Sequence, residues 1–215
     1  MELKMINKIT HTLDTNSQTD ARAILVELID WKQAFDRQDP KLGVEAFIKT
    51  GVRPSLIPIL ISYFQDRTMQ VKWKGNLSSP RNLPGGGPQG ATLGLLEYSA
   101  QSNDNSNFVN KDEKYKFVDD LSLLEVINLV TIGITSYNFK HHVASDIAID
   151  HHFIPAENLK SQQYLENISE WTQRNKMLLN MKKTKYMVIN FTNNFQFSTR
   201  LQLQNENIDN IEEAK

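Results

Sequence analysis

Two adjacent carboxylates, Asp119 and Asp120, are the residues of this sequence that are best suited to chemistry. They lie between two apolar, β-prone segments, 115–118 and 121–127, which predicts a tight hairpin with the acids at its tip. Because successive strand side chains point to opposite faces, one acid can face a site while its neighbour faces the turn. An ordinary surface turn that carries two aspartates is the alternative.

A third carboxylate, Asp30, follows an apolar run at residues 23–29, Ala-Ile-Leu-Val-Glu-Leu-Ile. This run is long enough for a buried central strand and too short for a convincing helix. A carboxylate at the point where a buried strand leaves the core is costly to desolvate unless it meets a cation. Asp30 is therefore a candidate metal ligand.

A glycine-rich loop, Leu-Pro-Gly-Gly-Gly-Pro-Gln-Gly at residues 83–90, runs directly into a predicted helix at 89–100. Consecutive glycines let a backbone approach a ligand closely, and the prolines restrict the loop. The N–H groups at the start of the helix would suit an anionic group. A linker is the alternative, but a linker seldom runs straight into an apolar helix.

Together, the strand carboxylate, the hairpin carboxylates and the glycine loop point to metal-assisted phosphoryl transfer. In that chemistry two Mg²⁺ ions about 3.5–4 Å apart clamp the attacking and leaving oxygens, and carboxylates supply the protein ligands. Asp30, Asp119 and Asp120 would be those ligands.

The remaining pattern predicts the elements that position these residues. We expect helices at 41–50, 54–66 and 158–176, strands at 68–73, 186–191 and 195–204, and a turn at 74–76. Residues 126–134 fit either a strand or a helix. A window at 141–152 holds four histidines and two aspartates, which fit either a metal site or a solvated loop.

Composition limits the classes of function. The chain has 215 residues, 40% of them hydrophobic and 23% charged, which is typical of a globular protein. A module that binds nucleic acid mainly through its phosphates is strongly basic, whereas this chain has a net charge of −1. If the protein binds nucleic acid, its positive charge is either local or supplied by a part that is absent from this sequence. The absence of cysteine excludes disulfides, cysteine-bound zinc and thiol catalysis. No run is long enough to span a membrane and residues 1–19 are too polar for a secretory signal, so we expect an intracellular soluble domain with no membrane partner.

Residues 24–191 resemble the reverse transcriptase domain of LINE-type, non-long-terminal-repeat retrotransposons. Four motifs carry the resemblance, in the family's order. They are the first palm motif at 29–36 (Ile-Asp-Trp-Lys-Gln-Ala-Phe-Asp), the nucleotide loop at 84–94, the aromatic-x-Asp-Asp box Phe117-Val118-Asp119-Asp120, and the Leu-Asn-x-x-Lys-Thr-Lys element at 179–185.

The resemblance implies an RNA-directed DNA polymerase that adds deoxynucleotides to a primer 3′ end with two Mg²⁺ ions, or Mn²⁺ in their place. The resemblance implies that Asp30 and Asp119 bind the metals, with Asp120 beside them. It implies that Phe35 is a steric gate against a ribose 2′-OH, and that Gln89, with Gly87 and Gly90 in the loop, contacts the nucleotide. It also implies that Lys183, or its neighbour Lys182, is a general acid near the leaving pyrophosphate.

The resemblance also implies an α+β palm. We expect an antiparallel sheet containing the strand at 24–30 and the hairpin at 115–127, backed by the helices at 89–100 and 158–176. The predicted domain covers residues 23–204, between a polar lead-in at 1–22 and a polar tail at 205–215, with fingers and thumb largely missing.

The implied partners are an RNA template, a DNA primer and deoxynucleoside triphosphates, and a longer polyprotein would supply the fingers, thumb and endonuclease. The implied compartment is the nucleus or the cytoplasm. This sequence departs from the family at Gly87, where Val or Ile is more usual, and in the polar residues 96–101. A truncated, catalytically inactive remnant with weak nucleic-acid binding is the alternative function. An RNA-dependent RNA polymerase is disfavoured because a bulky residue at Phe35 suits deoxynucleotides.

Overall fold

The computed structural model describes residues 2–14, 22–88, 90–128, 151–152, 154–190, 196–197 and 199–211. The chain divides into two compact units. The first unit comprises Met1–Asp30, Phe108–Glu170 and Leu179–Lys215, and the second comprises Trp31–Asn107 and Trp171–Leu178. The two units subdivide the single domain predicted at 23–204, whose outer boundaries stay a prediction.

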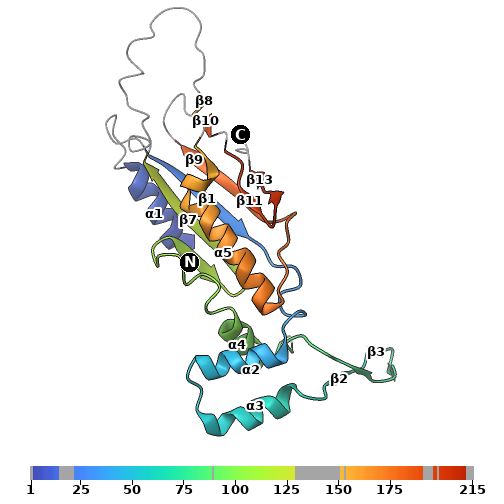
Figure 1. Ribbon diagram of the computed structural model, residues 1–215. Helices are drawn as coiled ribbons and strands as arrows, with labels where there is room; N and C mark the ends of the chain where they lie inside the picture. Colours follow the sequence, from blue (N-terminus) through green and yellow to red (C-terminus); the bar gives the residue numbers. More distant parts are fainter. Residues whose placement is uncertain are drawn as a thin grey trace, which may run out of the picture. The chain divides into compact units, whose positions relative to one another are not determined.

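A five-stranded sheet with the order β13-β9-β1-β7-β6 forms the centre of the first unit (Figure 1). Strand β1 pairs antiparallel with both β7 and β9, and β6 pairs antiparallel with β7. Strand β13 joins β9 in parallel, so the sheet is mixed rather than wholly antiparallel. The predicted α+β class is confirmed. The strands are β1 (Arg22–Ile29), β6 (Lys114–Phe117), β7 (Asp120–Asn128), β9 (Lys185–Asn190) and β13 (Asp209–Asn210).

One face of this sheet packs against helix α1 (Glu2–Asp14). Ile24, Val26 and Leu124 form the buried core on this face, and Met5 and Ile9 of α1 pack against them. The polar lead-in predicted at 1–22 therefore contains a helix, which the sequence analysis did not predict. Met5 and Ile9 are four residues apart, so they fall on the same side of a helix.

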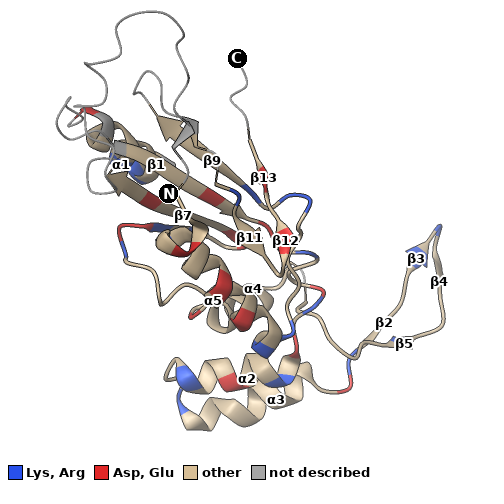
Figure 2. Cartoon of the chain, turned by 45° about the horizontal axis from the view of Figure 1, so that its top comes forward, with Lys and Arg blue, Asp and Glu red and all other residues tan. Residues whose placement is uncertain are grey.

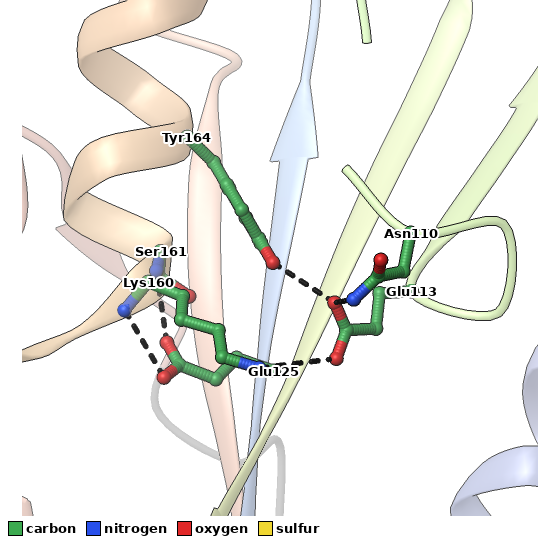
Figure 3. Close-up of polar contacts among 6 residues, drawn as sticks. All are labelled: Asn110, Glu113, Glu125, Lys160, Ser161 and Tyr164. Carbon is green, nitrogen blue, oxygen red and sulfur yellow. Dashed lines mark hydrogen bonds and ion pairs between the residues drawn. The ribbon is translucent and has the colours of Figure 1, made fainter. Parts of the chain in front are cut away.

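The opposite face carries two acidic side chains beneath helix α5 (Lys160–Asn175). Glu27 is opposite Leu123 and Glu125 is opposite Leu25, so both acids point to the same face. Glu125 accepts hydrogen bonds from the backbone N–H groups of Lys160, at 3.1 Å, and Ser161, at 2.8 Å (Figure 3). It thereby caps N–H groups that have no partner within the helix.

Glu27 is fully buried in β1. Burial raises the pKa of its carboxyl to about 8, the Ser161 hydroxyl offsets part of that rise, and repulsion from Glu125 adds to it. Glu27 is therefore mostly protonated at neutral pH.

A third acid, Glu113, interacts with two side chains of α5, Lys160 and Tyr164, and with Asn110 (Figure 3). The Tyr164 hydroxyl donates to it at 2.9 Å and the Asn110 amide at 3.0 Å, and the Lys160 ammonium lies 3.5 Å away. Partial burial alone would raise the pKa of Glu113, but these three groups hold it below its usual value. Glu113 is therefore charged where Glu27 is not.

Three helices form the core of the second unit: α2 (Pro40–Lys49), α3 (Ile57–Phe64) and α4 (Thr92–Gln101), with a 3₁₀ turn, η1 (Pro54–Leu56), before α3. Phe47, Leu60 and Phe64 are buried between them. Asp39 caps α2 by accepting from the Lys41 N–H at 2.9 Å, and Gly51 follows the helix at φ +84°. The three predicted helices here are confirmed, with α4 beginning at Thr92.

An arm of residues 68–82 extends away from these helices within the second unit (Figure 1). It contains β2 (Thr68–Met69) paired with β5 (Arg81–Asn82), and β3 (Lys72–Trp73) paired with β4 (Asn76–Leu77). The predicted strand at 68–73 is thus two short strands. The turn predicted at 74–76 is a two-residue loop, Lys74–Gly75, and Asn76 already belongs to β4.

Short elements complete the described residues. Strand β8 (His151–His152) pairs in parallel with β10 (Gln196–Phe197), η3 (Ala156–Asn158) precedes α5, and β11 (Gln202–Leu203) pairs with β12 (Glu206–Asn207). The strand predicted at 195–204 is therefore two separate strands. Residues 129–150, which hold most of the histidine window and much of the ambiguous segment, lie outside the described residues. In the described part of the chain, no helix has the length and apolarity needed to cross a membrane.

We predict that stability falls as pH rises because of Glu27. Its pKa is about 8 in the folded chain and has its ordinary value of 4.5 in the unfolded one, so the folded state holds an extra proton between these values. The free energy of unfolding should fall by roughly 1 kcal/mol per pH unit across this window. Urea unfolding of the parent and of Glu27→Gln from pH 5 to 9 measures this slope.

Glu27→Gln should be the more stable protein at pH 8 and should have the flatter profile. Glu157→Gln, which alters an exposed acid, is the matched control and should leave the profile unchanged. A Glu27→Gln profile as steep as that of the parent would rule out Glu27 as the source.

Candidate active site

The three predicted metal-binding carboxylates come to the same end of the first unit's sheet, where β1 ends and β7 begins; this end is called the carboxylate edge below. Ile29 pairs with Leu121, so the next positions along the ladder are Asp30 and Asp120. Phe117 pairs with Asp120 across the β6–β7 hairpin, which leaves Val118 and Asp119 as its two-residue loop. The predicted hairpin is confirmed, with Asp119 in its loop and Asp120 as the first residue of β7.

The exposure of these acids suits a cation that keeps part of its water shell better than one enclosed by protein ligands. Asp30 is half-buried, whereas Asp119 and Asp120 are exposed. Within the described residues, no group of three or more His, Asp or Glu side chains is arranged to hold a metal ion. Carboxylate oxygens are ligands that Mg²⁺ accepts, and Mg²⁺ usually keeps several waters. The donor types fit Mg²⁺, and the role of the three residues as ligands stays a prediction.

The hairpin loop is strained at Val118, which has φ +54°. A β-branched residue in the left-handed region is a genuine outlier. Two-residue hairpin loops favour positive φ at their first position, where glycine or asparagine is usual. The turn thus imposes a conformation that valine does not prefer, directly before Asp119, and such strain is concentrated at functional sites.

The segment before β9 is bonded to the backbone of Asp30. The Asn180 N–H donates to the Asp30 carbonyl at 2.9 Å, and the Asp30 N–H donates to the Thr184 hydroxyl at 3.2 Å. The Thr184 N–H donates in turn to the Asn180 carbonyl at 2.8 Å. These three hydrogen bonds fix the backbone position of Asp30 at the end of β1.

The same segment brings the predicted general acid to the carboxylate edge. Leu28 pairs with Lys185, so continuing the β1–β9 register places Lys183 level with Asp30. Lys182 and Lys183 are exposed, and the Lys183 N–H donates to Asn180 at 2.9 Å. Sequence reasoning gave no role to Thr184, which is fully buried. Its bond to Asp30 joins residues 154 positions apart, so no local pattern signals it.

We predict that Thr184→Val destabilises the chain by about 1–3 kcal/mol, because it leaves the Asp30 N–H without its acceptor. Thr184→Ser keeps the hydroxyl and should lose less. Urea unfolding of the three proteins measures the difference. The reverse order, with serine the weaker variant, would mean that Thr184 acts through its methyl group.

The glycine loop of the second unit is bonded to the turn that follows Asp30. The Gly87 N–H donates to the Phe35 carbonyl at 2.7 Å, and the Gly86 N–H donates to the Gln38 carbonyl at 2.8 Å. The half-buried Phe35 ring lies with its centroid 4.8 Å from that of Tyr98 in α4. The backbone and the ring of the predicted steric gate are therefore both held.

The predicted nucleotide-binding residues of the loop differ in their surroundings. Gly87 is buried, its N–H is occupied by Phe35, and a Cβ there would collide with the Gln38 amide oxygen. Gly90 is exposed at φ +81°. Gln89 lies outside the described residues. Gly87 thus has a packing role in the loop, and nucleotide contact by these residues stays a prediction.

A buried acid that sequence reasoning missed, Glu97, lies beneath the loop. It is fully buried in α4, and a Cβ on Gly43 of α2 would lie 2.5 Å from its Oε1. Burial raises the pKa of Glu97 to about 7; the Arg67 guanidinium opposes the rise and Asp39 adds to it. The signal in the sequence was the polar stretch at 96–101, where an apolar run is usual.

We predict that Gly94→Ala destabilises the chain by about 1–3 kcal/mol, because the new Cβ would collide with the Pro88 carbonyl oxygen of the loop. This loss should outweigh the helix propensity that alanine gains, which is about 1 kcal/mol. Gly90→Ala, which meets no atom within 4 Å, is the matched control and carries only backbone strain of about 1–2 kcal/mol. Thermal unfolding measures both, and a Gly94→Ala protein more stable than the parent would refute the collision.

A cavity of about 830 Å³ lies in the second unit, between α2, α3 and the root of the arm. Its lining includes Asp39, Lys41, Glu45, Asp66 and Arg67. Because acids and bases are mixed, the charge of this lining does not select a ligand of one sign.

Comparisons with known proteins give a fold but no family. No protein-family model matches this chain, and no curated protein matches it. Among solved structures, the chain is similar to apo telomerase from Candida tropicalis truncated from the C-terminal domain, with a TM-score of 0.50 and 15% identity. The match covers 89% of this chain and 35% of that one, so this chain spans about a third of the telomerase chain. At this identity the likeness shows the fold alone.

Proposed function

We propose that this chain is the reverse transcriptase domain of a LINE-type retrotransposon, which adds deoxynucleotides to a primer 3′ end on an RNA template. The observation that carries the proposal is that Asp30, Asp119, Asp120 and Lys183 come to one edge of one sheet. The distant fold likeness to telomerase supports it. A longer polyprotein would supply the fingers, thumb and endonuclease.

The proposed roles follow from chemistry. Asp30 and Asp119 would hold two Mg²⁺ ions, with Asp120 beside them; the ions would supply charge neutralisation for the attacking and leaving oxygens. Lys183 would place positive charge, and a proton, near the leaving pyrophosphate. The Thr184 and Asn180 bonds would keep Asp30 in place.

The loop residues would position the nucleotide. Phe35, held against Tyr98, would collide with a ribose 2′-OH and select deoxynucleotides. Gln89 and Gly90 would contact the nucleotide, with Gly87 setting the loop conformation. Such positioning contributes much of the rate in phosphoryl transfer, because little covalent chemistry is left to the protein.

A catalytically inactive remnant is the second candidate. Two observations favour it: the described acids do not form a metal-binding cluster, and the net charge of −1 gives little overall attraction to nucleic acid.

Primer extension separates the two candidates. With Mg²⁺, deoxynucleotides and a DNA primer on an RNA template, extension by the parent chain that Asp119→Asn/Asp120→Asn abolishes would identify a self-sufficient polymerase. Circular dichroism of both proteins controls for folding. A folded parent that extends no primer would refute the proposed activity of this chain and favour the remnant.

A further inference from the structure

We propose that the arm of residues 68–82 is a binding element for single-stranded nucleic acid, in which Trp73 stacks on an unpaired base and Lys72, Lys74 and Arg81 contact phosphates. This inference goes beyond the proposed function, because it would hold equally for an inactive remnant.

The arm displays apolar side chains that soluble proteins usually bury. Every residue from 68 to 82 is exposed. Trp73 is 72% exposed, whereas Trp31 and Trp171 are 7% and 2% exposed. Met69 and Val71, earlier in the same arm, are 48% and 59% exposed. Contiguous exposed apolar groups mark interaction sites.

The charge of the arm selects an anionic partner. Lys72, Lys74 and Arg81 lie within it, and the sequence has no acid from residue 67 to residue 82. Figure 2 shows the arm with basic residues only. Since the whole chain has a net charge of −1, this is a local excess of positive charge. An excess of this kind attracts phosphates through counterion release.

The cation and the aromatic ring are adjacent at the tip. The Lys74 ammonium lies 6.0 Å from the centroid of the Trp73 ring. Proteins that bind single strands combine positive charge along the backbone with aromatic rings on which bases stack. Trp73 and Lys74 supply both at one point.

The arm presents these groups in a fixed geometry although its side chains are exposed. Lys74 and Gly75 have φ +47° and +86°, the signs of a type I′ hairpin loop, and they close the pair Trp73–Asn76. The Ser78 N–H donates to Val71 at 2.9 Å and the Ser78 hydroxyl accepts from Val71 at 3.0 Å. A prearranged surface loses less entropy on binding.

An unpaired base fits the arm better than a duplex does. Stacking needs the open face of a base, and a duplex hides those faces between neighbouring pairs. A second copy of this chain would have to bring acidic groups to three cations. Residues 67–82 contain no acid, so two arms cannot supply these groups to each other, and single-stranded nucleic acid is the occupant we commit to.

The test is fluorescence anisotropy of the full chain with a labelled 12-nucleotide single strand, as RNA and as DNA, and with the matching duplex. Trp73→Ala should weaken single-strand binding by about 5- to 100-fold, from the usual loss on removing one stacking ring. Trp73→Phe should keep most of the affinity. Leu77→Ala removes a side chain that is 62% exposed on the same arm and is the matched control, with an expected change below about twofold.

Salt dependence tests the phosphate contacts. Lys72→Gln/Lys74→Gln should reduce the slope of log affinity against log salt by about 1.4, at about 0.7 per contact on a single strand. Trp73 fluorescence should also be quenched on binding, and this quenching should disappear in Trp73→Phe.

Several outcomes would overturn the inference. They are equal affinity of Trp73→Ala and the parent, tighter binding of the duplex than of the single strand, an equal loss in Leu77→Ala, or self-association in sedimentation velocity that Trp73→Ala abolishes. Asp119→Asn/Asp120→Asn should bind the single strand as the parent does. Failure of primer extension with intact binding would therefore refute the proposed activity and leave this inference standing.

Discussion

The register of β1 is the constraint on which the first unit depends. This strand pairs with β7 at eight positions and with β9 at six. A slip of one residue would turn Ile24 and Val26 away from α1 and would move Asp30 out of line with Asp120. The same hydrogen bonds therefore build the core and set the carboxylate edge. A mutation that disturbs one disturbs the other, and stability and geometry at this site are not separable.

Each unit also contains one buried acid whose protonated form is favoured. Glu27 lies under α5 and Glu97 lies under the glycine loop, and burial raises the pKa of both, to about 8 and about 7. Two other acids of the first unit, Glu125 and Glu113, accept hydrogen bonds from nearby donors. Burying an acid without a donor costs stability as soon as it ionises. The two units thus share a physical weakness at high pH that neither sheet nor helix patterns reveal.

The sequence predicts those parts of the fold that local patterns determine. The buried strand before Asp30, the hairpin around Asp119 and the helix that begins at Pro40 follow from apolar runs and turn residues. Helix α1 was missed because only Met5 and Ile9 mark its buried side. Strand β13 was missed because its two residues become a strand only by pairing with β9. Local patterns cannot encode such tertiary pairing.

The candidate site divides in the same way. Asp30, Asp119 and Lys183 were predicted because residue type and motif order point to them. Thr184 and Glu97 were not, because each acts through a partner that is distant in sequence or hidden by packing. Net charge misleads for a related reason: it averages over the chain, whereas a phosphate responds to charges within about one Debye length, roughly 8–10 Å. The local charge of the arm, with Lys72 and Lys74 flanking the exposed Trp73 in sequence, therefore matters more for a phosphate there than the overall charge of the chain does.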